Sequence, residues 1–134
     1  MLASAPVAAA EALKDLVEIS SQVRNAVVFG PDGSVEATTL AEKAGVELAR
    51  KANELLDAAS RVREGGGAVN QLEVATAEGS VFVVRDAERA IAATTSPDPT
   101  VGLVFYDLKS CLRDAAQKPE PKRTSTRKKK SDGA

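Results

Sequence analysis

The chain has 134 residues, of which 43% are hydrophobic, and its 18 Lys and Arg nearly balance 19 Asp and Glu. This length fits a single domain that buries a core without disulfides. The chain has no His and only one Cys, which excludes Ser-His-Asp and Cys-His catalysis, His-ligated or multi-Cys metal sites and an internal disulfide. No apolar run approaches the ~20 residues of a membrane-spanning helix, and we expect a cytoplasmic protein.

The charges are distributed unevenly along the chain. Residues 118–134 carry seven Lys and Arg against two acidic residues, whereas residues 1–117 carry eleven against seventeen. The last segment also has no hydrophobic residue larger than Ala, so it cannot bury enough apolar surface to fold. We therefore divide the chain into an acidic globular domain, residues 1–117, and a disordered basic tail, residues 118–134.

The domain begins with a predicted helix and a predicted β-hairpin. Apolar residues recur at helical spacing over residues 4–22, with polar residues on the opposite face. A short apolar run then leads into Gly30-Pro31-Asp32-Gly33, which is typical of a turn. We expect hairpin strands at residues 25–30 and 34–38, the first of them covered on both faces.

The second helix has the clearest pattern in the sequence. Thr39 and Glu42 have the spacing of a capping box, in which each side chain accepts the other residue's backbone N–H, and the helix is predicted to run to Arg63. Its apolar side contains mostly small residues in its first half, which allows another backbone to approach closely. The residues of this side are Ala41, Ala44, Gly45, Leu48, Ala52, Leu55, Leu56, Ala59 and Val62.

Three strands and a last helix complete the predicted domain. Strand-like runs at residues 69–77, 80–85 and 89–95 are joined by short links, which favour an antiparallel meander. Asp98 as N-cap and Pro99 at the first helical position predict a helix that runs to the end of the domain. The predicted order of elements is α-β-β-α-β-β-β-α.

The sequence contains no recognisable catalytic or cofactor motif. Glycines 65–67 follow a helix and precede a strand, the reverse of a phosphate-binding loop, and no Lys-Ser or Lys-Thr pair follows them. The carboxylates lie mostly on predicted exposed faces or in turns, without the spacing of metal ligands. Cys111 lies on the apolar side of the last helix, where we expect an inert buried thiol. We therefore expect a protein that is not an enzyme and that binds neither a metal nor a cofactor.

The basic tail allows several interpretations. It could bind nucleic acid through the phosphates, adhere to an anionic membrane, contact an acidic protein surface, or remain a solvated segment without a partner. It has no aromatic residue for stacking on bases. The cations concerned are Lys122, Arg123, Arg127, Lys128, Lys129 and Lys130.

Three segments in this order of elements resemble the roadblock/dynein light chain family. They are the turn Phe29–Gly33, the apolar strand Gly79–Val84 and the helix start Pro99–Leu103, and the resemblance covers about residues 7–117. It implies a profilin-like α/β fold in which a five-stranded antiparallel sheet lies between helix layers. The long second helix would cover one face of the sheet and the two terminal helices the other.

The resemblance also implies a function. Such domains form homodimers in which the third strands pair edge to edge and the long helices pack across the two-fold axis, and family members regulate Ras-like small GTPases or act as scaffolds for them. The interface residues carried over to this sequence are Ala41, Ala44, Gly45, Leu48 and Ala52 on the helix, and Val69, Gln71, Glu73 and Ala75 on the strand.

The alternatives stay open at this point. The small residues of the long helix could instead face only their own sheet. The chain could also be an adaptor that binds nucleic acid or an anionic membrane through its tail. A small-ligand sensor is a third interpretation, although the sequence lacks the aromatic residues typical of ligand pockets.

Overall fold

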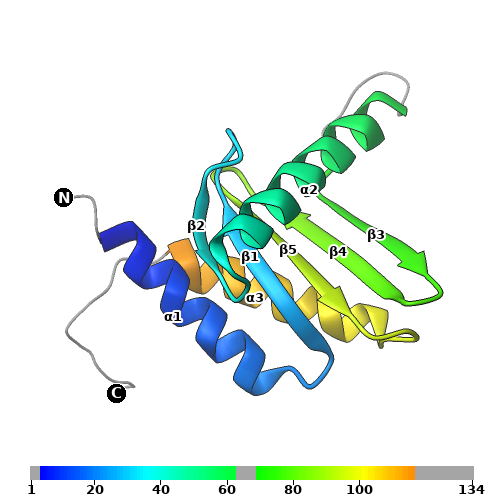
Figure 1. Ribbon diagram of the computed structural model, residues 1–134, viewed down its shortest axis with the longest axis horizontal. Helices are drawn as coiled ribbons and strands as arrows, with labels where there is room; N and C mark the ends of the chain where they lie inside the picture. Colours follow the sequence, from blue (N-terminus) through cyan, green and yellow to red (C-terminus); the bar gives the residue numbers. More distant parts are fainter. Residues whose placement is uncertain (1–3, 63–68, 117–134) are drawn as a thin grey trace, which may run out of the picture.

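The computed structural model describes residues 4–62 and 69–116 and contains three helices and one five-stranded sheet (Figure 1). The elements follow one another in the predicted order, which confirms the α-β-β-α-β-β-β-α arrangement. They are α1 (Ser4–Ile19), β1 (Val23–Phe29), β2 (Val35–Thr38), α2 (Glu42–Val62), β3 (Gln71–Thr76), β4 (Gly79–Arg85), β5 (Ala90–Thr95) and α3 (Val101–Ala116).

The sheet is antiparallel throughout and has the strand order β2-β1-β5-β4-β3. The hairpin β1–β2 and the meander β3–β4–β5 are therefore joined through the central pair β1–β5. Helices α1 and α3 lie on one face of the sheet and α2 crosses the other face (Figure 1). The predicted arrangement of a sheet between helix layers is confirmed, with β2 and β3 at its two edges.

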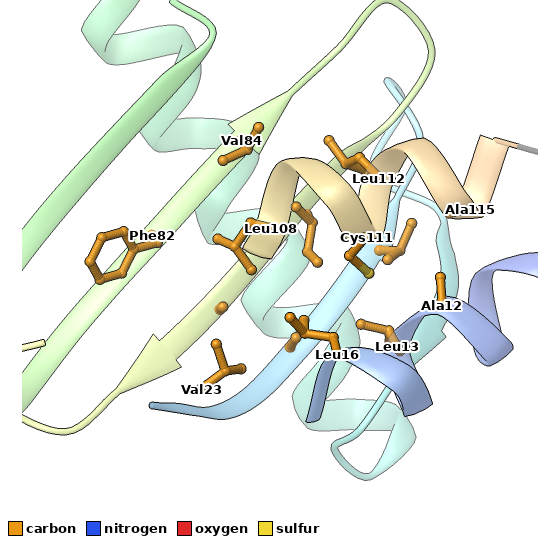
Figure 2. Packing of buried hydrophobic residues seen from close by; sticks show 14 of the residues in the cluster. Ala12, Leu13, Leu16, Val23, Phe82, Val84, Leu108, Cys111, Leu112 and Ala115 are labelled. Atoms are coloured by element: carbon orange, nitrogen blue, oxygen red, sulfur yellow. The ribbon is translucent and has the colours of Figure 1, made fainter. Parts of the chain in front are cut away.

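The core consists of two clusters, one on each face of the sheet. Phe82 and its neighbour Val83 are both fully buried, but Phe82 belongs to the cluster under α1 and α3 and Val83 to the cluster under α2. Phe82 also meets the Phe105 ring edge to face, with ring centroids 5.0 Å apart. Figure 2 shows Phe82 and Val84 of β4 together with the inward side chains of α1 and α3. The unbroken apolar runs in β1 and β4 thus belong to strands covered on both faces.

The predicted capping box of α2 is wrong. The Thr39 hydroxyl accepts a hydrogen bond from the backbone N–H of Ala26 at 3.0 Å, and the Thr39 N–H donates to the Ala26 carbonyl at 2.9 Å. Thr39 therefore continues the pairing of the hairpin with β1. The helix begins three residues later, at Glu42, and in its first turn the Gly45 N–H donates to the Ala41 carbonyl.

Two other helix ends also differ from the prediction. The helix α1 ends at Ile19, before Gln22, whose side-chain oxygen accepts a hydrogen bond from the Thr100 N–H at 2.6 Å. The Thr100 carbonyl accepts the bond from the Val104 N–H, so Thr100 rather than Asp98 is the residue before the first turn of α3. Asp98 itself has a φ of 61° and belongs to the preceding turn.

Candidate interaction surface on α2 and β3

The apolar side of α2 consists of two adjacent stripes. The inward stripe lies against the sheet and is buried; it comprises Gly45, Ala49, Ala52 and Leu56. Gly45 is required there because a Cβ at this position would lie 2.7 Å from the Thr38 hydroxyl oxygen in β2. The small residue at position 45 thus allows β2 of the same chain to approach the helix, as the alternative interpretation of this helix anticipated.

The outward stripe of α2 is exposed beside the inward one. Leu48, Leu55 and Val62 are spaced seven residues apart, two helical turns, so they lie on one line along the helix. Leu48 is half-buried, Leu55 is 37% exposed and Val62 is 84% exposed. The exposed Ala44, in the first turn, and the exposed Ala41, just before the helix, continue this side of the helix to its start. A repeat of this kind on a solvent face is typical of a helix that packs on a second helix.

The edge strand β3 borders this stripe. Leu72 is paired with Val83, and Val74 with Val81, so Leu72 and Val74 lie on the α2 face of the sheet. Leu48, Leu72 and Val81 pack around the same buried cluster, which joins the helix stripe and the strand into one surface. Within the described residues β3 is paired only with β4, and its sequence QLEVAT has neither Pro nor Lys to block further pairing.

A family model supplies the identification. The model of the Roadblock/LC7 domain matches residues 9–96, about two thirds of the chain. The chain belongs to the Roadblock/LC7 family. No curated protein matches it in sequence.

Solved structures share the roadblock fold. A Roadblock/LC7 domain from Streptomyces avermitilis has a TM-score of 0.70 at 20% identity, covering 77% of this chain and 90% of that one. The gliding protein MglB from Thermus thermophilus has a TM-score of 0.65 at 15% identity, covering 84% and 89%. A LokiProfilin2 solved in complex with rabbit actin has a TM-score of 0.56 at 15% identity, covering 77% and 91%. At these identities the similarity shows the fold alone, which is the profilin-like one expected.

The structure distributes the interface residues that the sequence predicted over several environments. Gly45 and Ala52 are buried against the sheet of their own chain, whereas Ala41, Ala44 and Leu48 lie on the outward stripe. Gln71, Glu73 and Ala75 are exposed on the opposite face of β3 from α2. Val69 lies just before β3 and is half-buried in the cluster under α2.

Leu55, Val62, Leu72 and Val74 were not among the predicted interface residues. All four lie on the surface formed by α2 and β3. The seven-residue spacing of Leu48, Leu55 and Val62 was the signal that could have identified the helical part. Leu72 and Val74 could have been found from the alternation of β3, once its α2 face was known.

The described part of this roadblock domain offers few groups for chemistry. Burial raises the pKa of the Cys111 thiol to about 12, with further contributions from the charges of Asp114 and Asp15. Residues 4–62 and 69–116 hold no group of three or more potential metal ligands and no helix long and apolar enough to cross a bilayer. Glycines 65–67 and the basic tail lie outside the described residues.

Proposed function

We propose that this roadblock domain is a non-enzymatic, dimeric regulator that binds a Ras-like small GTPase and favours one of its nucleotide states in the cytoplasm. The observation that carries the proposal is the exposed stripe of Leu48, Leu55 and Val62 beside the open edge of β3. The membership in the Roadblock/LC7 family and the fold shared with MglB support it.

The dimer uses the same surface of both copies. Two β3 strands pair antiparallel across a two-fold axis, which gives each edge a hydrogen-bonding partner and continues the sheet. The outward stripes of the two α2 helices then face each other across this axis. Ala41, Ala44 and Leu48 are the predicted helix residues that contribute directly, while Gly45 and Ala52 support the helix from inside.

The GTPase binds to the composite surface that dimerisation creates around the paired α2 helices. A binding partner shifts the nucleotide state of a GTPase only as far as its affinities for the two states differ. In this proposal the domain regulates the GTPase by binding alone. Stimulated hydrolysis would then come from the GTPase's own residues, held in their reactive arrangement.

Retention of a GTPase by the immobilised full-length chain tests this function. A Ras-like GTPase from the same genome is loaded with GDP or with a non-hydrolysable GTP analogue. We expect one state to bind about tenfold more tightly or better, a difference of about 1.4 kcal/mol. Absence of retention in both states contradicts a direct regulator. A Leu55→Glu variant, which places a charge on the stripe, reports whether binding requires the dimer.

The positive charge of the tail supports a second candidate, an adaptor for nucleic acid or an anionic membrane. Seven Lys and Arg against two acidic residues in 118–134 give that segment a net charge opposite to that of the domain. Binding of this kind weakens steeply as salt rises. If the chain retains no GTPase but binds DNA, RNA or anionic vesicles, and loses this when Lys128, Lys129 and Lys130 are changed to Gln, the adaptor is the better description.

A further inference from the structure

A groove of about 920 Å³ lies on the side of the molecule away from the α2 stripe. Its walls are the start of β3, the turn between β4 and β5, and the C-terminal half of α3. Val84 and Leu112, which belong to the core under α1 and α3, form part of its lining, together with Ala116. The groove therefore combines an apolar floor with open access from solvent.

The rim of the groove is positively charged on an acidic domain. Its lining contains Arg85, Lys109 and Arg113 but only one acidic residue, Asp86. Residues 1–117 as a whole have eleven Lys and Arg against seventeen Asp and Glu. The sign of the charge in the groove is thus opposite to that of the domain around it.

The three cations are available for a partner. Among the described residues none of them forms an ion pair within 4 Å, whereas Arg50, Lys51 and Arg89 do. Arg85 donates one hydrogen bond to the Val69 carbonyl at 2.8 Å, which fixes its position and leaves further N–H groups for a ligand.

Lys109 and Arg113 lie one turn apart on α3. Like charges at this spacing destabilise a helix by a few tenths of a kcal/mol, although the C-terminal end of the helix dipole offsets part of the cost. An anion bound between them would relieve the repulsion.

We propose that this groove binds an acidic peptide segment of a partner protein, with carboxylates on the cationic rim and an apolar side chain on the floor. The charge of the groove selects against the chain's own basic tail. The acidic domain around it disfavours a nucleic acid, whose charges extend well beyond the groove. A second cavity of about 130 Å³ shares Arg85, Asp86 and Ala87 with the groove, but Asp57 and Glu88 also line it, so the acidic segment is confined to the groove itself.

This binding site is separate from the proposed GTPase surface. The floor of the groove belongs to the cluster under α1 and α3, on the opposite face of the sheet from α2. The inference therefore stands whether or not the chain regulates a GTPase.

The test measures binding of a fluorescein-labelled synthetic peptide, in which glutamate and leucine alternate, to the full-length chain by fluorescence anisotropy. The Lys109→Glu/Arg113→Glu variant should weaken binding by about tenfold or more, since it replaces two attractions with two repulsions. Both side chains are exposed, so the fold should be kept, as circular dichroism melting checks. The matched control Lys14→Glu/Arg24→Glu has the same change in net charge at exposed sites outside the groove and should bind almost as tightly as the parent.

Further arms separate the possible occupants. Peptides with glutamine for glutamate, or serine for leucine, should bind more weakly, because they lack the charge or the apolar anchor. Equal loss of binding in the groove variant and the Lys14/Arg24 control would show a non-specific charge effect and overturn the proposal. Loss only when Lys128, Lys129 and Lys130 are changed to Gln would place the peptide on the tail and overturn it as well. Tighter binding of a labelled single-stranded oligonucleotide, sensitive to the groove variant, would assign the groove to nucleic acid instead.

Discussion

Removing the outward stripe of α2 should dissociate the proposed dimer without unfolding the domain. In the Leu55→Ala/Val62→Ala variant the two residues lose side chains that are 37% and 84% exposed in the single chain. Together, the exposed surface of these two residues is slightly more than that of one full aliphatic side chain, and a partner could bury it. Burial of one such side chain is worth about 2 kcal/mol.

Each residue occurs twice in a symmetric dimer, so the double variant should weaken association by about 4 kcal/mol, or about a thousandfold in Kd. Sedimentation velocity over a dilution series measures this constant. Because Leu55 is partly covered by its own chain, the dissociated chain should lose about 1 kcal/mol of stability and a few degrees in Tm while staying folded.

Val46→Ala provides the matched control on the same helix. Val46 is 47% exposed, comparable to Leu55, but it lies on the other flank of α2. Asn53, seven residues further on, donates from its side chain to the Pro31 carbonyl in the β1–β2 turn, which shows where this flank points. An unchanged Kd in the double variant, or equal weakening by Val46→Ala, would refute the assignment of the interface. A parent chain that is strictly monomeric at tens of micromolar would refute the dimer itself.

Three further outcomes can be checked on the purified chain. Gly79 has a φ of 151°, and a Cβ there would lie 2.1 Å from the Thr95 carbonyl oxygen. Gly79→Ala should therefore lower the free energy of unfolding by about 2–3 kcal/mol and Tm by about 10 °C or more. The control Gly102→Ala has open space around the new Cβ and should not lower Tm. The Cys111 thiol, whose pKa burial raises to about 12, should not react with a thiol reagent at pH 8 until the chain is unfolded by denaturant. Burial raises the pKa of Asp114, and the nearby Asp15 adds to the shift. Ionisation of Asp114 therefore opposes folding, and Asp114→Asn should raise Tm at neutral pH. This gain should vanish as the pH falls below the ordinary aspartate pKa of 3.8.

Elements whose signals are local were predictable from the sequence. The apolar run that contains Phe82 and Val83 indicates a strand covered on both faces, and neighbouring side chains indeed enter different core clusters. The turn before Ser34 follows from its Pro and Gly residues, because Pro fixes its own φ and Gly tolerates a positive φ, which Gly33 adopts at 87°. The order of strands and helices follows from such signals together with short connections.

The helix ends were not predictable, because they depend on partners far away in the chain. Thr39 has the spacing of a capping residue, but its hydroxyl is engaged by the N–H of Ala26, thirteen residues earlier. The Thr39 hydroxyl thus accepts a hydrogen bond from β1 instead of capping the N-terminus of α2. The start of α3 similarly involves a distant partner, because the N–H of Thr100 donates to the side chain of Gln22, 78 residues earlier in the chain.

The division of the apolar side of α2 into an inward and an outward stripe was not predictable for a different reason. Leu55 and Leu56 are consecutive apolar residues of one helix, and periodicity assigns both to the same broad apolar side. Only the position of the sheet separates them: Leu56 is fully buried beneath α2, while Leu55 stays partly exposed beside it. The cationic groove had no local signal at all, because Arg85 and Arg113 come from different elements that only the fold brings together.

The two edges of the sheet differ in a way that favours the proposed assembly in pairs. The edge strand β2 is half-buried along its length, and it is held by the close approach of Gly45 to Thr38 and by the ion pair of Glu36 with Arg89 at 3.0 Å. The other edge, β3, is exposed at nearly every residue. A sheet with one protected edge and one open edge cannot add copies indefinitely, since pairing β3 with β3 uses the open edge of both partners. Any larger assembly must therefore use a different surface, such as the face of α1 and α3.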